Sequence, residues 1–404
     1  MRLHRNLVLA VMDALYHIFN DDVYADKQIA QTLKRDKRWG SHDRGFIAET
    51  TYDIVRWKRL YAEIAEISEP FKRDELPRLF AVWATLKGIS LPDWGVFEGT
   101  PTRRIKGRFD ELKKTRAIGQ SIPDWLDELG QKELGAMWDV EIAALNQQAP
   151  VVLRANTLKT TPAKLRQRLL DEQIVTKLLK EYPDALELEE RKNVFATSVF
   201  KEGLFEVQDA SSQEVARMLD VQPGMRVVDA CAGAGGKTLH LAALMENKGN
   251  VVAMDIYQNK LNELKRRARR AGAHNIETRL IDSTKTVKKL HSKADRLLID
   301  APCSGLGVLK RNPDAKWKLQ PEFIENIKKT QAQLLRDYAK MVKPGGKMVY
   351  ATCSVLSSEN EQQVSAFLDS QEGAGFVFDK EKKIYAHQSG YDGFYMALLE
   401  RANT

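Results

Sequence analysis

The stretch Leu297–Asn312, LLIDAPCSGLGVLKRN, contains the pattern that decides the fold. A short apolar run leads into Asp300, and Pro302, Cys303 and a glycine-spaced loop follow it. An apolar run that is cut off by proline and glycine is typical of a buried strand ending in a loop. In open α/β sheets, ligands bind at the loops that follow the carboxyl ends of the strands. We therefore expect Asp300 and Cys303 to lie at the rim of a site.

A second pattern of this kind, MVYATCS in Met348–Ser354, places Cys353 after another apolar run. The chain from Ser211 onward alternates between strand-like and helix-like segments, which predicts a doubly wound, mostly parallel α/β sheet. The expected strands are Met225–Ala230, Asn250–Met254, Ile276–Ile281, Arg296–Ile299 and Lys347–Ala351, and the expected helices are Ser211–Leu219, Thr238–Asn247, Gln258–Ala271 and Pro321–Val342. We expect a further strand within Gly390–Glu400, at the edge of this sheet.

Two other parts are expected to precede the sheet. Residues 1–145 have apolar side chains at helical spacing and are predicted to be all-helical. Residues 146–208 contain the alternating segment VVLRANTLK and then Thr161-Pro162, which is typical of a helix start. We predict a small α/β linker module there, followed by the sheet domain over residues 209–404.

The composition favours a cytoplasmic protein with an anionic partner. The formal net charge is +8, and the three cysteines are too few and too scattered for a disulfide framework or a zinc site. The N-terminus, MRLHRNLVLAVMDAL, is similar to a signal peptide, but Asp13 interrupts its apolar run, so we expect a helix. No stretch is long and apolar enough to predict a membrane span.

The segment Lys34–Arg44 is rich in basic residues and contains Trp39. It could be an RNA-facing surface, because basic side chains with an interleaved aromatic ring are typical of nucleic-acid contacts. It could equally be a solvated loop with one half-buried tryptophan. The sequence leaves both interpretations open.

The segment Val227–Thr238, VVDACAGAGGKT, predicts a strand, a glycine turn and a helix. It is not a P-loop, because Cys231 stands where that motif needs glycine, and it is not a dinucleotide fingerprint, because Thr238 replaces the third glycine. What remains is a glycine turn that lets a ligand approach the backbone, opening a helix whose N-terminus favours a carboxylate. Cys231 itself is expected to be a small buried residue.

Acidic residues end the two following strands. Asp255 is suited to the hydroxyls of a ribose, and Asp282 can face the edge of an adenine. Together with the glycine turn, this combination fits S-adenosylmethionine, with its amino-acid end near the turn. The alternative is a generic strand–helix turn with two surface acids.

The two remaining cysteines suggest covalent catalysis on a pyrimidine. Carbon 5 of cytosine is a poor nucleophile, but it becomes enamine-like when a thiolate adds at carbon 6. The thiol needs a cation nearby to lower its pKa, and Lys237, Lys310 and Arg311 are candidates. The alternative is that Cys303 and Cys353 are small buried residues, the usual state of a free cysteine.

At these motifs the sequence resembles the Sun/NOP family of RNA cytosine-C5 methyltransferases. The segments that carry the resemblance are EGLFEVQDASSQ (202–213), DAPCSGLGVLKRNPDAKWK (300–318) and YATCSVLSSENE (350–361). The resemblance implies that Cys353 attacks carbon 6, that Cys303 assists release of the product, and that Asp300 contacts the cytosine or the methionine end of the cofactor. It also implies a set of residues that bind S-adenosylmethionine: Cys231, Ala232, Gly233, Ala234, Gly235, Gly236, Lys237, Asp255, Asp282 and Asp300.

One departure concerns the glycine loop, which in the family usually reads Ala-Pro-Gly-Gly-Lys. Here Gly233 and Ala234 stand in place of Ala-Pro, and loss of the proline is expected to loosen the turn. The N-terminal part resembles a NusB-like RNA-binding domain, chiefly through SHDRGFIAETTYDIVRWKRL (41–60). Bacterial members with this domain order are similar to the 16S rRNA methyltransferase.

We therefore expect a Rossmann-like methyltransferase domain, preceded by a small α/β module and an all-α NusB-like domain. The expected partner is RNA, with 16S rRNA favoured over tRNA, and no membrane or metal is expected. One rival interpretation is a methyltransferase for a protein or a small molecule, which would not need two thiols. The other is a non-catalytic RNA-binding or antitermination module.

Overall fold

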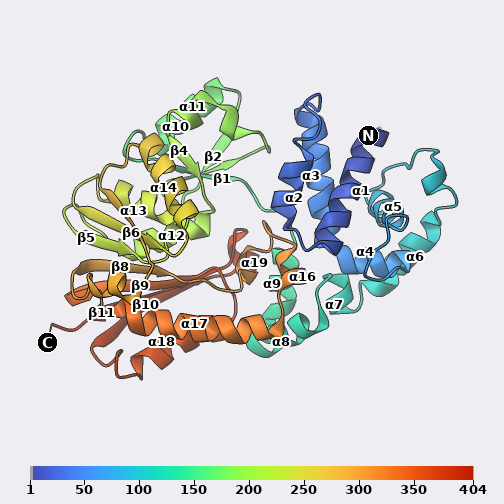
Figure 1. The fold of residues 1–404 in the computed structure, drawn as a ribbon. Helices are drawn as coiled ribbons and strands as arrows, with labels where there is room; N and C mark the ends of the chain where they lie inside the picture. Colours follow the sequence, from blue (N-terminus) through green and yellow to red (C-terminus); the bar gives the residue numbers. More distant parts are fainter. Residues whose placement is uncertain (1–2, 404) are drawn as a thin grey trace. The chain divides into compact units, whose positions relative to one another are not determined.

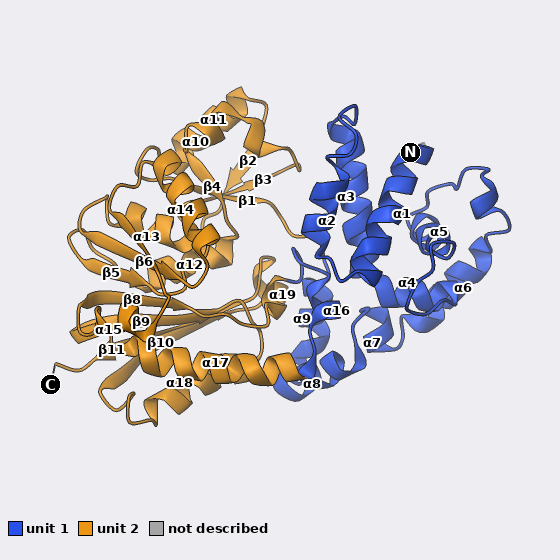
Figure 2. Cartoon of the chain, viewed as in Figure 1, with its two compact units in different colours: residues 1–147, 309–321 blue, residues 148–308, 322–404 orange. Residues whose placement is uncertain are grey.

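The computed structural model describes residues 3–403, so Met1 and Arg2 of the expected N-terminal helical segment lie outside the described residues, as does Thr404. The chain forms two compact units (Figure 2). The first contains residues 1–147 and 309–321, and the second contains residues 148–308 and 322–404. No helix among the described residues is both long and apolar enough to cross a membrane.

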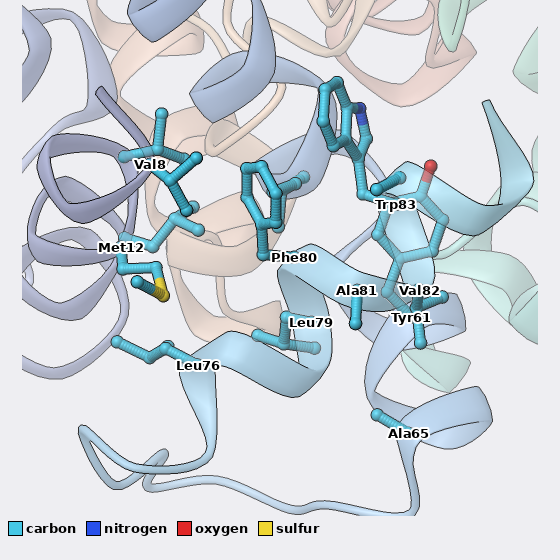
Figure 3. Close-up of a cluster of buried hydrophobic side chains, with 14 of the residues drawn as sticks. Val8, Met12, Tyr61, Ala65, Leu76, Leu79, Phe80, Ala81, Val82 and Trp83 are labelled. Atoms are coloured by element: carbon cyan, nitrogen blue, oxygen red, sulfur yellow. The ribbon is translucent and has the colours of Figure 1, made fainter. Parts of the chain in front are cut away.

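The first unit is built from helices. They are α1 (Arg5–Asn20), α2 (Ala25–Thr32), α3 (Ser41–Arg56), α4 (Lys58–Ala65), α5 (Leu76–Leu86), η1 (Gly95–Phe97), α6 (Thr102–Leu112), α7 (Arg116–Gly119), α8 (Asp124–Leu134), α9 (Met137–Leu145) and α16 (Ala315–Lys318). Helix α5 buries almost every side chain, and Figure 3 shows Phe80 of α5 near Val8 and Met12 of α1. The predicted all-helical structure is present in this unit because these apolar stripes share one core.

The basic segment that contains Trp39 is largely engaged within the helical unit. The Trp39 ring packs, partly buried, against the core. The Arg44 guanidinium donates to the backbone carbonyls of Leu33 (2.9 Å) and Trp39 (3.0 Å). Arg38 makes a paired contact with Asp36. The contacts of Trp39 and Arg44 fit a loop with a half-buried tryptophan. The side chains of Lys34, Lys37 and Arg38 are exposed to solvent, so the RNA-facing surface stays a prediction.

Residues 309–321, which follow the Cys303 loop in the sequence, belong to the helical unit. The Trp317 indole donates to the Val55 carbonyl (2.8 Å), and Asp314 accepts from the backbone nitrogen of Ala25 (2.9 Å). Lys316 is fully buried and donates to Asn146 Oδ1 (2.8 Å). Burial lowers the pKa of Lys316 well below its usual range. The stretch that decided the fold is therefore divided between the two units.

A small antiparallel sheet opens the second unit, with strand order β2-β3-β1-β4. Its elements are β1 (Val152–Ala155), α10 (Pro162–Asp171), β2 (Thr176–Leu178), β3 (Ala185–Leu188), η2 (Val194–Ala196), α11 (Ser198–Lys201) and β4 (Phe205–Val207). The Thr161 side chain accepts from the Lys164 nitrogen and so caps α10, which begins at Pro162 as predicted.

The large sheet has strand order β10-β11-β9-β8-β5-β6-β7 and is Rossmann-like (Figure 1). Strands β5 to β9 pair in parallel, which confirms the predicted doubly wound fold class. The strands are β5 (Arg226–Asp229), β6 (Asn250–Asp255), β7 (Ile276–Leu280), β8 (Ala294–Asp300), β9 (Val342–Thr352), β10 (Phe376–Ile384) and β11 (Phe394–Arg401). The remaining elements are α12 (Ala210–Met218), α13 (Gly236–Leu244), α14 (Gln258–Ala271), α15 (Thr284–Lys288), η3 (Leu306–Val308), α17 (Pro321–Ala339), η4 (Ser357–Glu359), α18 (Glu361–Leu368) and α19 (Ala386–Ser389).

The sheet is covered on both faces. Val227 of β5 packs in a cluster with α12, α13 and α14, whereas Val228, the next residue, packs in a cluster with α17 and α18. Successive side chains of a strand point to opposite faces, so each strand contributes to both cores. This double burial explains the nearly continuous apolar runs in the sequence.

The prediction that the strand within Gly390–Glu400 lies at the sheet edge is wrong. That strand, β11, lies between β9 and β10 and pairs antiparallel with both. Strand β10 forms the edge, and its sequence, FVFDKEKKI, is rich in charge and mostly exposed. Charged side chains are tolerated there because an edge strand is open to water. We did not predict β10 because its sequence lacks a buried apolar face.

Candidate active site

The structure brings Cys303 and Cys353 together. They follow the carboxyl ends of β8 and β9, which are adjacent parallel strands, and their Sγ atoms are 3.3 Å apart. Both residues are half-buried and neither forms a disulfide. The hydrogen bond with the Cys353 thiol, together with burial, raises the pKa of Cys303 well above its usual range. Two thiols at this distance can reach the same small ligand.

A glycine contact holds the two cysteine loops close to each other. Gly307, just beyond Cys303, donates its N–H to the Cys353 carbonyl (2.9 Å) and accepts from the Gly393 nitrogen (2.7 Å). A Cβ atom at Gly307 would lie 2.2 Å from the Gly393 oxygen, so no larger residue fits. A glycine four residues after Cys303 is therefore required for the two cysteine loops to approach each other.

Asp300 and Lys237 form an ion pair beside the thiols. Lys237 Nζ lies 2.7 Å from Asp300 Oδ2, and the lysine side chain is only 12% exposed. Burial alone would lower the pKa of Lys237, but the Asp300 carboxylate and the nearby Cys353 raise it above its usual value. Lys237 is thus a cation next to Cys353. The other two candidate cations, Lys310 and Arg311, belong to the helical unit.

The glycine loop is fixed to the end of the neighbouring strand. Asp255 accepts from the backbone nitrogens of Gly233 (2.8 Å) and Tyr257 (2.8 Å). Gly235 has φ +88° and is the N-cap residue just before helix α13, and a Cβ there would lie 2.5 Å from Leu264 Cγ. At Gly233, by contrast, an added Cβ would meet no atom within 4 Å. The loop therefore leaves free space above Gly233, next to a carboxylate, in which a ligand can approach the backbone.

Polar contacts from other elements support the same loop. The other predicted loop residues contribute mainly backbone groups: Ala232 donates to the Met254 carbonyl (2.8 Å), Ala234 accepts from Arg267 (2.8 Å) and Gly236 accepts from Arg154 (2.6 Å). Arg154 is on β1 of the small sheet and is fully enclosed. Sequence reasoning missed it, although a lone arginine in the strand-like run VVLRA was a signal.

The floor of the loop is buried and acidic. The Thr238 hydroxyl donates to Asp229 Oδ2 (2.7 Å), and burial raises the pKa of Asp229 to about 7. Burial also raises the pKa of Cys231 well above its usual range, with the acidic neighbours Asp229 and Asp300 adding to the effect. Cys231 is therefore an unreactive thiol, as its sequence context suggested.

Asp282 is placed differently from Asp255. It accepts from the hydroxyls of Ser283 (3.1 Å) and Thr286 (2.9 Å), and these bonds hold its pKa below the usual range. Beside Asp255, Ile256 and Tyr257 are 59% and 53% exposed. Large apolar side chains at the end of a strand can support a flat ring. Sequence reasoning missed this pair, and the signal was the apolar residue directly after the strand-ending acid.

Comparison with known proteins places the chain in a family. The family model described as 16S rRNA methyltransferase RsmB/F matches residues 216–400, and an RsmF/B-like ferredoxin-like domain matches residues 122–195. A Synechocystis protein described as a probable ribosomal RNA small subunit methyltransferase B is 34% identical, over 94% of this chain and 96% of that protein. The chain belongs to the RsmB/F family of 16S rRNA methyltransferases. This confirms the family resemblance seen in the sequence.

Other relatives agree with this assignment. The ribosomal RNA small subunit methyltransferase B of Serratia proteamaculans is 36% identical over 74% of this chain and 71% of that protein. The crystal structure of PH0851 has the same fold over 99% of this chain and 100% of its own, with a TM-score of 0.82 and 24% identity. A methyltransferase homologue from Pyrococcus horikoshii matches with a TM-score of 0.63 and 26% identity, over 72% of this chain and 99% of its own.

As a member of this family, the chain is an RNA methyltransferase that uses S-adenosylmethionine. The structure fits that cofactor, because free space above Gly233 adjoins the Asp255 carboxylate, which accepts from the Gly233 nitrogen. Among residues 3–403, no cluster of three or more histidine, cysteine or acidic side chains could hold a metal ion.

Proposed function

We propose that this member of the family methylates carbon 5 of a cytosine in RNA, and that Cys353 is the nucleophile. The observation that carries the proposal is the approach of two thiols to 3.3 Å at the ends of adjacent strands, beside the Lys237–Asp300 ion pair. A methyltransferase acting on a nitrogen or an oxygen atom needs no thiol, whereas carbon 5 needs one to become nucleophilic.

In the proposed mechanism, Cys353 gives its proton to solvent and its Sγ forms a bond to carbon 6 of the base. Lys237, held as a cation by Asp300, lies near Cys353. The electron pair of the carbon 5–carbon 6 double bond then makes carbon 5 nucleophilic. S-adenosylmethionine, when bound, supplies the methyl group on a positively charged sulfur. Carbon 5 takes up the methyl group, the proton on carbon 5 leaves, and the Cys353–carbon 6 bond breaks to restore the ring double bond.

Cys303 assists the second half of this sequence. Cys303 keeps its proton as long as Cys353 is free, since the hydrogen bond with the Cys353 thiol raises the pKa of Cys303. Once Cys353 is bonded to carbon 6, that contact no longer favours the protonated form of Cys303. In the proposed step Cys303 gives its own proton to solvent, and the resulting thiolate takes the proton from carbon 5. The electron pair of that carbon–hydrogen bond re-forms the ring double bond and expels Cys353 as a thiolate. The pair would thus divide the work, with Cys353 forming the adduct and Cys303 resolving it.

The remaining predicted residues are assigned to the cofactor and the base. Asp255 would bind the ribose, Asp282 would face the adenine edge, and the loop from Cys231 to Lys237 would receive the methionine end. Asp300, at the end of β8, would contact the cytosine or the methionine end of the cofactor. These roles are consistent with the position of the loop and of Asp255 at the carboxyl ends of parallel strands.

For the substrate, we propose a cytosine of 16S rRNA, with tRNA as the alternative, in the cytoplasm. The three-part division into residues 1–145, 146–208 and 209–404 would assign RNA binding to the basic surfaces of the first two parts. The target base must be unpaired or extruded, because carbon 6 is inaccessible inside a stacked helix, and extrusion costs a few kcal/mol. Binding through phosphates should weaken steeply as salt is raised.

The test uses Cys303→Ala. If Cys303 resolves the adduct, this variant should form a covalent protein–RNA complex that shifts on a denaturing gel, because Cys353 can still attack. The double variant Cys303→Ala/Cys353→Ala is the control and should give no shift. A Cys303→Ala variant that shows no shift and normal turnover would contradict the assignment.

The modified position would be found by bisulfite sequencing of RNA from cells with and without the gene. Loss of one protected cytosine in small-subunit rRNA supports the proposal in full. Loss in a tRNA keeps the chemistry and moves the substrate. Full activity after both cysteines are replaced would instead favour a methyltransferase with a protein or small-molecule substrate. RNA binding without any heat of S-adenosylmethionine binding would favour a non-catalytic module.

A further inference from the structure

A fully buried carboxylate, Glu359, lies between the two cysteine loops. Its Oε1 accepts from the hydroxyls of Ser304 (2.5 Å) and Ser354 (2.6 Å). Its Oε2 accepts from the Ser304 backbone nitrogen (2.8 Å) and from Gln331 Nε2 (2.9 Å). We call these four residues the carboxylate clamp.

Each serine of the clamp directly follows a cysteine. Ser304 follows Cys303 and Ser354 follows Cys353, so the two contacts of Oε1 join the two loops through one atom. Consecutive Cα atoms are about 3.8 Å apart, so fixing a serine restrains the cysteine before it. The clamp thus sets the distance between the two thiols by holding the serines that follow the cysteines. Its hydrogen bonds are made to these serines and not to the thiols.

Contacts behind the clamp restrain the same loops from further sides. Gln331 on α17 also donates to the carbonyl of Pro302 (3.0 Å), the residue before Cys303. Asn360, next to Glu359, donates to the carbonyl of Ser354 (3.0 Å). The hydroxyl of Tyr350 on β9 donates to the Glu359 carbonyl (2.7 Å). Both loops are therefore held against one helix and one strand.

The energetics make this arrangement cooperative. A carboxylate removed from water is costly unless hydrogen bonds replace its solvation. Here the replacement comes from both loops at once, so moving either loop leaves part of a buried charge unsatisfied. The carboxylate charge also contributes to the raised pKa of Cys303, which keeps that thiol protonated.

We propose that Glu359 is a positioning residue that holds Cys303 and Cys353 as a pair. Its catalytic consequence rests on the proposed function, in which both thiols act on one base. Misplacing a reacting group by about 1 Å can cost about 100-fold in rate. Loosening the clamp should therefore slow the chemical steps while leaving the binding of RNA and cofactor in place.

The experiment compares Glu359→Gln with Glu361→Gln. The first change replaces one acceptor oxygen by an NH₂ group that faces the donors of Ser304 or Gln331. The second is the same chemical change two residues away, where Glu361 pairs with Lys383 on the outside of the clamp. Ser354→Ala is a milder variant in case Glu359→Gln does not fold. It removes the contacts of the Ser354 hydroxyl with Glu359 and Ser304 but leaves the carboxylate bonded to Ser304 and Gln331.

Two readouts are measured on each full-length variant. The first is steady-state methylation of RNA, resolved into kcat and KM. The second is the rate at which diamide joins Cys303 to Cys353, a reaction in which two thiols lose two hydrogens to diamide and form one disulfide. Peptide mapping identifies the bond. Melting and calorimetric S-adenosylmethionine binding verify that each variant is folded.

For Glu359→Gln we expect kcat to fall by about 100-fold with KM values within about threefold, and disulfide formation to slow by about tenfold. Ser354→Ala should show smaller changes in the same direction, and Glu361→Gln should behave as the unaltered protein. A folded Glu359→Gln variant with normal kcat and normal disulfide formation would overturn the proposal. Slower disulfide formation in an enzyme that methylates an atom other than carbon 5 would support the clamp and reject the proposed function.

Discussion

The glycine loop and the cysteine pair lie at the carboxyl ends of neighbouring strands, but different kinds of bonds hold them. The glycine loop is fixed mainly through its backbone, for example by the bond from Gly233 to Asp255 (2.8 Å). The cysteine pair is fixed through buried side chains that converge on Glu359. A loop that must let a ligand approach closely gains from having few side chains. In the proposed mechanism two thiols meet on one base, and that requires side-chain contacts that define the distance between them.

The cysteines themselves illustrate this difference. Cys231 also follows a strand, but its burial among acidic groups raises the pKa of its thiol. Cys353 lies beside a cation, Lys237, and within 3.3 Å of a second thiol. Position at the end of a strand is therefore not sufficient for reactivity. We expect the neighbouring charges to distinguish the thiol that acts from the one that does not.

The largest expected effect comes from Cys353→Ala. Removing the proposed nucleophile should reduce methylation by at least about 10⁴-fold, because the proposed mechanism activates carbon 5 through this thiol. The affinity for S-adenosylmethionine, measured by calorimetry, should change by less than about threefold. The matched change Cys231→Ala should keep kcat within about threefold and affect mainly the KM for the cofactor. If Cys231→Ala were the more damaging of the two in kcat, the distinction drawn between the two regions would be wrong.

The same comparison shows which parts were readable from the sequence. Helix α14 was predicted with its observed bounds, Gln258–Ala271, because its apolar spacing and a final glycine define it locally. The approach of the two cysteine motifs was also predictable, since both follow buried parallel strands. The place of β11 inside the sheet was not, because strand order depends on which edges remain free after folding.

The carboxylate clamp could not be predicted for a related reason. Glu359 stands in a polar loop, SSENE, where the sequence gives no sign that its carboxylate is fully buried. Its partners Ser304 and Gln331 are distant in the chain, and a satisfied buried charge leaves no local pattern. The same holds for residues 309–321, whose burial in the helical unit depends on contacts such as Trp317 with Val55. Contacts of this kind become visible only in three dimensions.

The next prediction separates folding from cofactor binding within the glycine loop. Gly235→Ala should lower the free energy of unfolding by about 3 kcal/mol, because φ is +88° and the added Cβ would lie 2.5 Å from Leu264 Cγ. Gly233→Ala should lower it by only about 1 kcal/mol, since φ is +54° and no atom lies within 4 Å. Denaturant unfolding measures both values.

A further prediction concerns the affinity of the Gly233→Ala variant for the cofactor. Calorimetry on folded Gly233→Ala protein should show weaker S-adenosylmethionine binding, because the new methyl group occupies the free space above the loop. We expect about a tenfold loss. Unchanged affinity in this variant, together with unchanged stability, would mean that the space above Gly233 is not used by the cofactor.

The last prediction concerns the pH dependence contributed by the floor of the glycine loop. The pKa of Asp229 is raised by burial from 3.8 to about 7 in the folded protein. Between these values the unfolded chain releases the Asp229 proton and the folded chain keeps it, so this group makes the protein less stable as pH rises from about 4 to about 7. Above pH 7 both states are ionised and the loss levels off. From pH 5 to pH 8 we expect a loss of about 3 kcal/mol from this residue. Asp229→Asn keeps an acceptor for the Thr238 hydroxyl and has no carboxyl proton to lose. The unfolding free energy of this variant should therefore lack the part of the pH dependence that comes from Asp229.

Urea unfolding of both proteins at pH 5, 6.5 and 8 gives the difference directly. Parallel pH profiles for the two proteins would show that Asp229 is ionised in the fold, and that the floor of the loop is more polar than its burial implies.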